Sequence, residues 1–303
     1  MKKKTFNILL SVAAYSFLIY KLVSYGNYAE LISIFSNAQA CRYVCLISAI
    51  ILFPLNIFLE SVKWRYLSGN IKSISINEAQ RQVYYGYLGA FLTPARVGEY
   101  PSRALFYDKK NILTLTALGY IGSAALMLVM IVFGLIALPV YLSHSDAIKI
   151  TYFLPYCLLV ILLLLVVVLS FPRIFDKLYI KYNKDIFKCL ASFKKSNFLI
   201  VLWYSFLRYA LYVVQFILVL YFCNIGLSYS EILVSVAVYY MLVTLTPSFA
   251  LADAAIRGSW AVVVFTAFSE QAALSAAIAA VIIWVINTVF PMIVGSVVSS
   301  KLK

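Results

Sequence analysis

Charged residues are scarce in this sequence. Only 12% of its 303 residues are Asp, Glu, Lys or Arg, whereas a soluble domain carries about 25%. Hydrophobic residues make up 64% of the chain. A soluble core could not cover this much apolar surface, so much of the molecular surface must face lipid. The composition excludes a soluble globular protein and predicts an integral membrane protein.

Histidine and paired cysteines are also scarce. The single histidine, His144, lies beside Ser145 and Asp146 in a short polar stretch, which we interpret as a loop between two spans. A catalytic triad needs these residue types brought together by folding rather than adjacent in sequence. None of the five cysteines forms a CxxC pair, and no Walker or dinucleotide-binding motif is present. We therefore expect no metal ion, no cofactor and no enzymatic activity.

Basic residues are in excess, and the formal net charge is +14. We expect no nucleic-acid partner, because these residues flank the apolar runs, as the topology rules for membrane proteins require. Lys2–Lys4 precede the first apolar run and are also typical of a signal peptide. The small residues of Ala38–Ala40 resemble a cleavage site, but they lie well beyond that run. We interpret the segment as a first transmembrane helix.

Apolar runs of about 20 residues are long enough to cross the hydrocarbon core of a bilayer. The sequence has six such runs, at roughly 6–24, 42–67, 112–140, 151–171, 198–223 and 270–298. Two further stretches, 78–106 and 231–268, are interrupted by proline and charge. The arm Glu78–Leu92 would measure only about 22 Å as a helix, too short to span comfortably. We predict an all-α polytopic membrane protein with about six full transmembrane helices and two re-entrant helical hairpins.

The positive-inside rule predicts how the chain crosses the membrane. Lys2–Lys4 place the N-terminus in the cytoplasm, and Lys301 and Lys303 place the C-terminus there too. The strongest group of basic residues lies in the segment 172–197, which predicts a cytoplasmic basic amphipathic segment. A helix lying on anionic lipid and a plain solvated loop both fit this segment.

The two hairpin stretches share a pattern of identical residues at an offset of 153. The first copy comprises Ser75, Glu78, Tyr87, Leu92, Thr93 and Pro94, and the second comprises Ser228, Glu231, Tyr240, Leu245, Thr246 and Pro247. Ser-x-x-Glu is a capping box, which begins a helix by satisfying free amides. Thr-Pro ends the helix, because proline has no amide to donate. The pattern therefore predicts where the first arm of each hairpin begins and ends.

The repeat also predicts the symmetry of the molecule. The span before the first hairpin runs inward and the span before the second runs outward, so the half-repeats, about 42–140 and 198–298, are expected to be inverted within a single domain, 1–303. Inverted repeats with broken helices are common in secondary transporters, which bind substrate where the repeats meet. The alternative is an old duplication that is retained for folding alone.

Ionisable side chains at membrane depth need a partner or a function, so we take those of the hairpins and neighbouring spans as candidate substrate-binding residues. The candidates are Glu78, Arg81, Arg96, Glu99, Arg103, Arg208, Glu231, Asp253 and Arg257, and the candidate hairpin breaks are Thr93, Pro94, Thr246 and Pro247.

The spacing of Arg96, Glu99 and Arg103 predicts that they share one helix face. As an alternative to substrate binding, Glu99–Arg103 and Asp253–Arg257 are spaced to form ion pairs that stabilise each hairpin. Arg96 has no acid four residues away. Arginines beside the positive end of a helix favour an anion, and a guanidinium suits phosphate. A phosphate in the middle of a membrane most plausibly belongs to a lipid.

At these residues the sequence resembles a known family. The segment Pro94–Glu99 reads Pro-Ala-Arg-Val-Gly-Glu and is followed by Arg103. This resembles the P-x-R-x-G-E-x-x-R signature of the transmembrane region of lysylphosphatidylglycerol synthase/flippases, with one more residue before the final arginine. Trp64–Leu67 and Ser75–Ala79 fit the same pattern. In the second half, Thr246–Ser248 with the later Asp253 and Arg257 resembles the family's Pro-Ser…Glu segment, although its glycines are missing and aspartate replaces glutamate.

The resemblance implies a flippase fold with paired re-entrant helices in the inner (cytoplasmic) membrane. In the namesake enzymes this region flips aminoacylated phosphatidylglycerol, and a separate soluble domain makes the lipid. We expect a stand-alone member without that domain, of the kind linked to glycolipid or polyprenyl-linked sugar metabolism. The resemblance points to Arg96, Glu99, Arg103 and Asp253 as the site residues.

The leading functional hypothesis is therefore translocation of a phosphate-bearing lipid or glycolipid with an anionic or zwitterionic headgroup. One alternative is a non-transporting membrane partner of envelope-biosynthesis proteins, anchored through the segment 172–197. The other is a lipid-phosphate transferase, which would need a metal-binding acidic cluster or a nucleophile–base pair. The interleaving of acids with arginines favours binding over metal ligation. The sequence does not define an oligomeric state.

Overall fold

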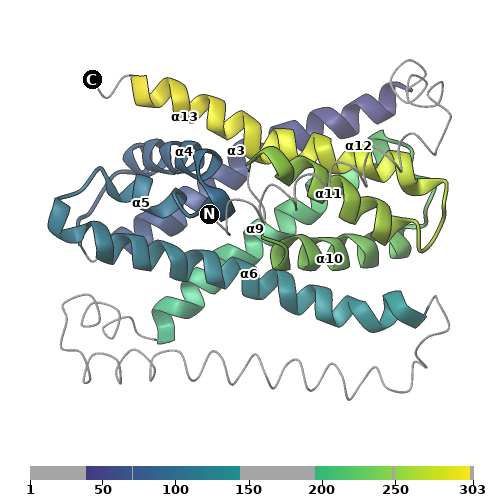
Figure 1. The fold of residues 1–303 in the computed structure, drawn as a ribbon, viewed down its shortest axis with the longest axis horizontal. Helices are drawn as coiled ribbons and strands as arrows, with labels where there is room; N and C mark the ends of the chain where they lie inside the picture. The colour runs from purple at the N-terminus through teal and green to yellow at the C-terminus, as the bar shows by residue number, and fades with distance from the viewer. Residues whose placement is uncertain (1–38, 70, 144–194, 248–249, 301–303) are drawn as a thin grey trace, which may run out of the picture.

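The computed structural model describes residues 39–69, 71–143, 195–247 and 250–300. All regular elements in these ranges are helical, as the sequence predicts (Figure 1). The predicted spans 6–24 and 151–171 lie outside the described residues, and so does nearly all of the basic segment 172–197.

Four helices in the described ranges are long and apolar enough to cross a membrane. They are α3 (Ala40–Ser68), α6 (Ile112–Ser143, preceded by the short η2, Lys109–Asn111), α9 (Lys195–Phe222) and a long helix composed of α12 (Ala272–Trp284), η4 (Val285–Val289) and α13 (Phe290–Ser300). They coincide with the predicted spans 42–67, 112–140, 198–223 and 270–298. The segment η4 is a π-helical turn, a local widening of a helix that is frequent at functional sites.

The first hairpin consists of α4 (Ile76–Leu92), the short turn η1 (Pro94–Arg96) and α5 (Glu99–Ala104). Ser75 forms the predicted capping box with Glu78, because each side chain accepts a backbone amide of the other residue. Both Ala95 and Arg96 have positive φ angles, 51° and 57°. The predicted common helix face of Arg96, Glu99 and Arg103 is therefore wrong, since Arg96 lies in the left-handed turn before α5 begins.

The second hairpin consists of α10 (Tyr229–Leu245) and α11 (Ala250–Phe265). Ser228 forms the second predicted capping box with Glu231. Its first arm has the same length as α4, 17 residues. The second arms differ, because α5 has six residues and α11 has 16.

Both first arms end at the predicted Thr-Pro break in the same way. Thr93 and Thr246 have extended backbones, which the following prolines favour. Each threonine hydroxyl donates to the carbonyl oxygen four residues earlier, Gly89 or Leu242, at 2.8 Å. The hydroxyl thereby adds a hydrogen bond to a carbonyl of the last turn, where the helix ends.

The two halves exchange contacts around the central pair α3 and α9. The first arm α4 packs on α13, the last helix of the chain, while the first arm α10 packs on α6 (Figure 1). Each first arm thus lies against the closing helix of the other half. The turn residues Ala95 and Arg96 of the first hairpin lie in the same region as the break at Thr246 and Pro247.

Candidate functional site

A cavity of about 590 Å³ lies between the two hairpins. It is lined from the first half by Arg96, Glu99 and Tyr87 and from the second half by residues that include Asp253 and Arg257. The break at Thr246 and Pro247 also lines it, as do Trp284, Asn287 and Thr288 of the long helix near its π-helical turn. Both hairpins and the widened helix therefore contribute to one space.

Glu60 is the centre of the ion-pair network beneath this cavity. Its carboxylate lies 2.6 Å from Arg103 Nη1 and 2.8 Å from Lys63 Nζ, and it also pairs with Arg208 Nη1. The Glu60 side chain is only 1% exposed. A carboxylate so deeply buried requires cationic partners, and here it has three. They come from α3 itself, α5 and α9, so Glu60 joins the first hairpin to the central helix pair.

Glu99 links this network to the cavity. One carboxylate oxygen accepts from Arg103 Nη2 at 2.6 Å, and the other accepts from Arg96 Nη2 at 3.0 Å. The predicted Glu99–Arg103 ion pair is confirmed. Arg96, for which the sequence offers no acid four residues away, pairs with the same carboxylate three residues away. Its side chain is 36% exposed, against 1% for Arg103, so Arg96 is the arginine of the first hairpin that faces the cavity.

Arg208 reaches the cavity from α9. Its Nε donates to Asn56 at 3.0 Å, and its Nη2 donates to the hydroxyls of Tyr212 at 2.8 Å and Tyr87 at 3.3 Å. Tyr87 also lies under the guanidinium of Arg96, 5.4 Å from ring centroid to Cζ. The tyrosine therefore contacts both arginines and contributes a cation–π interaction with one of them.

The second hairpin presents one ion pair to the cavity. Arg257 Nε lies 3.1 Å from Asp253 Oδ1, which confirms the pairing that the spacing predicts. Trp284 of α12 donates its indole N–H to the other oxygen of Asp253 at 2.9 Å. Beside them, Asn287 of η4 donates to Gln215 of α9 at 3.2 Å. The widened turn thus places polar groups at membrane depth with partners already in reach.

Four of the predicted site residues do not line the cavity: Arg103, which is buried in the ion-pair network, and Glu78, Arg81 and Glu231. Glu78 and Glu231 complete the capping boxes at the starts of α4 and α10, and Arg81 is exposed one turn into α4. The amide and hydroxyl of Ser75 lower the pKa of Glu78 by hydrogen bonding to its carboxylate. These residues position the first arms, and they are not among the residues that line the cavity.

The sequence analysis missed the central role of Glu60 and Lys63. Both residues fall inside the predicted span 42–67, and a charge within a span is by itself a signal of function or pairing. Their partners, Arg103 and Arg208, are 43 and 148 residues from Glu60 in sequence. Spacing rules for a single helix cannot detect pairs so distant in the chain.

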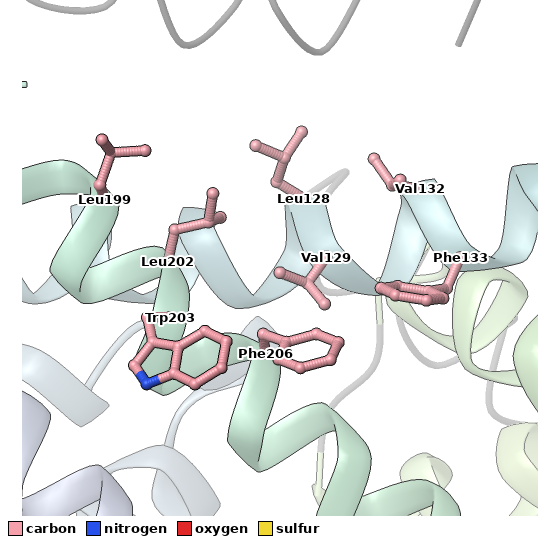
Figure 2. A pocket seen from close by; sticks show the side chains of 8 residues that line it. All are labelled: Leu128, Val129, Val132, Phe133, Leu199, Leu202, Trp203 and Phe206. Carbon is pink, nitrogen blue, oxygen red and sulfur yellow. The ribbon is translucent and has the colours of Figure 1, made fainter. Parts of the chain in front are cut away.

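A second hollow, of about 420 Å³, lies between α6 and α9 (Figure 2). Leu128, Val129, Val132 and Phe133 of α6 face Leu199, Leu202, Trp203 and Phe206 of α9 across it. Its lining has no charged side chain, so it has no group that could orient a headgroup. Within the described ranges, no group of three or more His, Cys, Asp or Glu side chains is placed to hold a metal ion.

Long apolar helices that surround buried ion pairs and a polar cavity define this molecule as a polytopic integral membrane protein. The chain belongs to the family described as the lysylphosphatidylglycerol synthase TM region, whose model matches residues 8–295. This match confirms the resemblance that the first hairpin motif indicates. No curated protein sequence matches the chain at a significant level. Membership of the family connects the protein with the handling of lipids.

Proposed function

We propose that the protein translocates a phosphate-bearing lipid or glycolipid across the cytoplasmic membrane. The observation that carries this proposal is the convergence of Arg96, Arg208 and Arg257 on one cavity between the two hairpins. Guanidinium groups bind phosphate oxygens through paired hydrogen bonds. A cavity at membrane depth with three arginines suits a headgroup that must leave water in order to cross.

Alternating access of this cavity would follow from an inverted repeat, which is part of the proposal. The equal first arms, the paired capping boxes and the matched Thr-Pro breaks support it. The exchange of contacts, α4 on α13 and α10 on α6, supports it as well. Each first arm would measure about 25 Å, shorter than the hydrocarbon core of about 30 Å. We therefore propose that both hairpins are re-entrant. The positive-inside rule supports cytoplasmic termini, which are also part of the proposal.

The experiment is a leaflet-accessibility assay in liposomes that contain the full chain. The labelled lipids are phosphatidic acid, a polyprenyl-phosphate sugar, an aminoacyl phosphatidylglycerol and phosphatidylglycerol. We expect the wild type to move at least one of them and Arg96→Ala to move it at least about tenfold more slowly, because one guanidinium contact to a phosphate is lost. Lys110→Gln, which removes an exposed charge outside the cavity, serves as the control and should be as fast as the wild type.

Two outcomes would contradict the proposal. If no lipid moves with either protein, translocation is wrong, and a non-transporting membrane partner of envelope-biosynthesis proteins becomes the better hypothesis. If Arg96→Ala moves lipid as fast as the wild type, the cavity is not the path.

A further inference from the structure

The ionisable groups around the cavity do not balance in charge among the described residues. Asp253 and Arg257 form a pair of one acid and one base. The rest of the network has two acids, Glu60 and Glu99, and four bases, Lys63, Arg96, Arg103 and Arg208. The network therefore carries an excess of two positive charges.

Lys63 belongs in this count as an ammonium group. Its Nζ lies 2.8 Å from Glu60 Oε2 and 3.2 Å from the carbonyl oxygen of Gly122. The Glu60 carboxylate at this distance stabilises the charged form of the amine. The three arginines are charged at any pH at which the protein is folded.

An uncompensated charge at membrane depth is costly, and two like charges in one network repel each other. Every acid of the network already has at least one cation within 3.0 Å, so protein groups of the network do not offset the excess. An anion in the cavity would offset it, and only a dianion would offset it completely. Arg96 and Arg208 line the cavity directly, so they can donate to such an anion.

The charge state of a phosphate depends on its esterification. A phosphodiester, such as the headgroup of phosphatidylglycerol, carries one negative charge. A phosphomonoester carries nearly two above its second pKa of about 6, and a diphosphate carries at least two. The phosphodiester would leave one positive charge of the network uncompensated.

We propose that the cavity selects lipids whose phosphate is dianionic, a lipid phosphomonoester or diphosphate, over lipid phosphodiesters. This inference rests on the proposed function, since it takes the cavity to be the headgroup site, and it names the class of headgroup. The lipid tail plays no part in the selection. Neutral parts of a headgroup beyond the phosphate are also compatible with the site, because the count concerns charge alone.

The test is a comparison of binding at about pH 7, where a phosphomonoester carries nearly two negative charges. The full chain is placed in phosphatidylcholine nanodiscs and titrated with dioleoyl phosphatidic acid, dioleoyl phosphatidylglycerol and inorganic phosphate, with tryptophan fluorescence as the readout. Trp284, which bonds to Asp253 at the cavity wall, is the reporter. We expect phosphatidic acid to bind at least about tenfold more tightly than phosphatidylglycerol, because the second charge meets the excess of the network.

Two variants connect the preference with the charge count. Arg96→Gln lowers the excess to one and should reduce the preference for phosphatidic acid to about threefold or less. The Arg96 side chain is partly exposed, so its replacement should leave the fold intact. An unchanged unfolding midpoint would confirm that the variant is folded. Lys110→Gln makes the same charge change on the surface and should keep the wild-type preference.

The possible results separate this inference from the proposed function. Equal or tighter binding of phosphatidylglycerol, or an unchanged preference in Arg96→Gln, would overturn the selection of dianions. Inorganic phosphate that binds as tightly as phosphatidic acid would show a site for free phosphate and would overturn the lipid assignment. Selective binding of phosphatidic acid without movement of any lipid would support the selection and overturn translocation. Movement of phosphatidylglycerol by a protein that does not prefer phosphatidic acid would support translocation and overturn the selection.

Discussion

The two hairpins begin alike and are held in different ways. In the first, Arg103 pairs with Glu99 of its own hairpin and with Glu60 of α3. In the second, Arg257 pairs with Asp253 of its own hairpin. Glu60 precedes the capping serine Ser75 by 15 residues, and the residue 15 before Ser228 is Val213. The second half thus has no carboxylate on α9 where the first half has one on α3.

The packing of the arms differs as well. In the first hairpin, a Cβ atom at Gly89 would lie 2.6 Å from the carbonyl oxygen of Gly98, so α4 and the start of α5 approach more closely than any larger residues would allow. At the equivalent position, α10 has Leu242. Two hairpins with the same helix starts and breaks can therefore differ in how they are held, and the first is fixed by a buried network of ion pairs. The other has an ion pair within α11, and its described links to neighbouring helices include the hydrogen bond from Trp284 to Asp253.

The strongest test of this difference is Glu60→Gln. Removal of the shared partner of three buried cations should lower the free energy of unfolding by about 3 to 5 kcal/mol, because it leaves buried charge uncompensated. Asp253→Asn should cost less, about 1 to 3 kcal/mol, since Arg257 is partly exposed. Thermal unfolding in one detergent measures both, with Glu78→Gln as a control that keeps the capping box. Equal losses for Glu60→Gln and Asp253→Asn would contradict the asymmetry.

Gly89→Leu tests the close contact of the first hairpin. The added side chain would meet Ser102 Oγ, 2.0 Å from the ideal Cβ position, and the backbone at Gly98. Overpacking of this kind costs about 1 to 3 kcal/mol. The matched control is Leu242→Met in α10, which keeps volume and should change stability little. A Gly89→Leu protein as stable as the wild type would show that α4 and α5 can separate freely.

Ser75→Ala and Ser228→Ala test the feature that the hairpins share. Each change removes the side chain that accepts the N3 amide, so each should destabilise the protein by about 1 kcal/mol. Thermal unfolding of the two single variants and of the double variant is the measurement. The two losses should be similar and additive, because the caps are far apart. A loss of stability in only one of the two single variants would show that the starts of α4 and α10 are not equivalent.

The smallest expected effect is a gain in stability. Ala95 has a φ angle of 51°, a region in which glycine avoids the strain of a Cβ atom. Ala95→Gly should therefore stabilise the folded state by up to about 1 kcal/mol. The unfolding midpoint measures this change, and Ala104→Gly in α5 should move it in the opposite direction, since the residue is buried in a helix. A destabilised Ala95→Gly protein would mean that the alanine methyl makes a needed contact.

Much of the fold could be predicted from local patterns. Length and hydropathy identified the four described spans, and the Ser-x-x-Glu and Thr-Pro patterns located the starts and ends of α4 and α10. The ion pairs Glu99–Arg103 and Asp253–Arg257 followed from helical spacing. The position of Arg96 could not be predicted from helical spacing, because the left-handed turn before α5 breaks the helical period.

The sequence by itself determined that this chain lies in a membrane, where α4 and α10 begin and end, and that two stretches share a pattern of residues. These properties depend on groups close together in the chain: apolar runs, caps and prolines. Only the tertiary structure decided that Glu60 pairs with Lys63, Arg103 and Arg208, and that Arg96 lines the same cavity as the second break. The physical reason is that a buried carboxylate takes its partners from whichever helices pack around it, and packing joins residues that are distant in sequence.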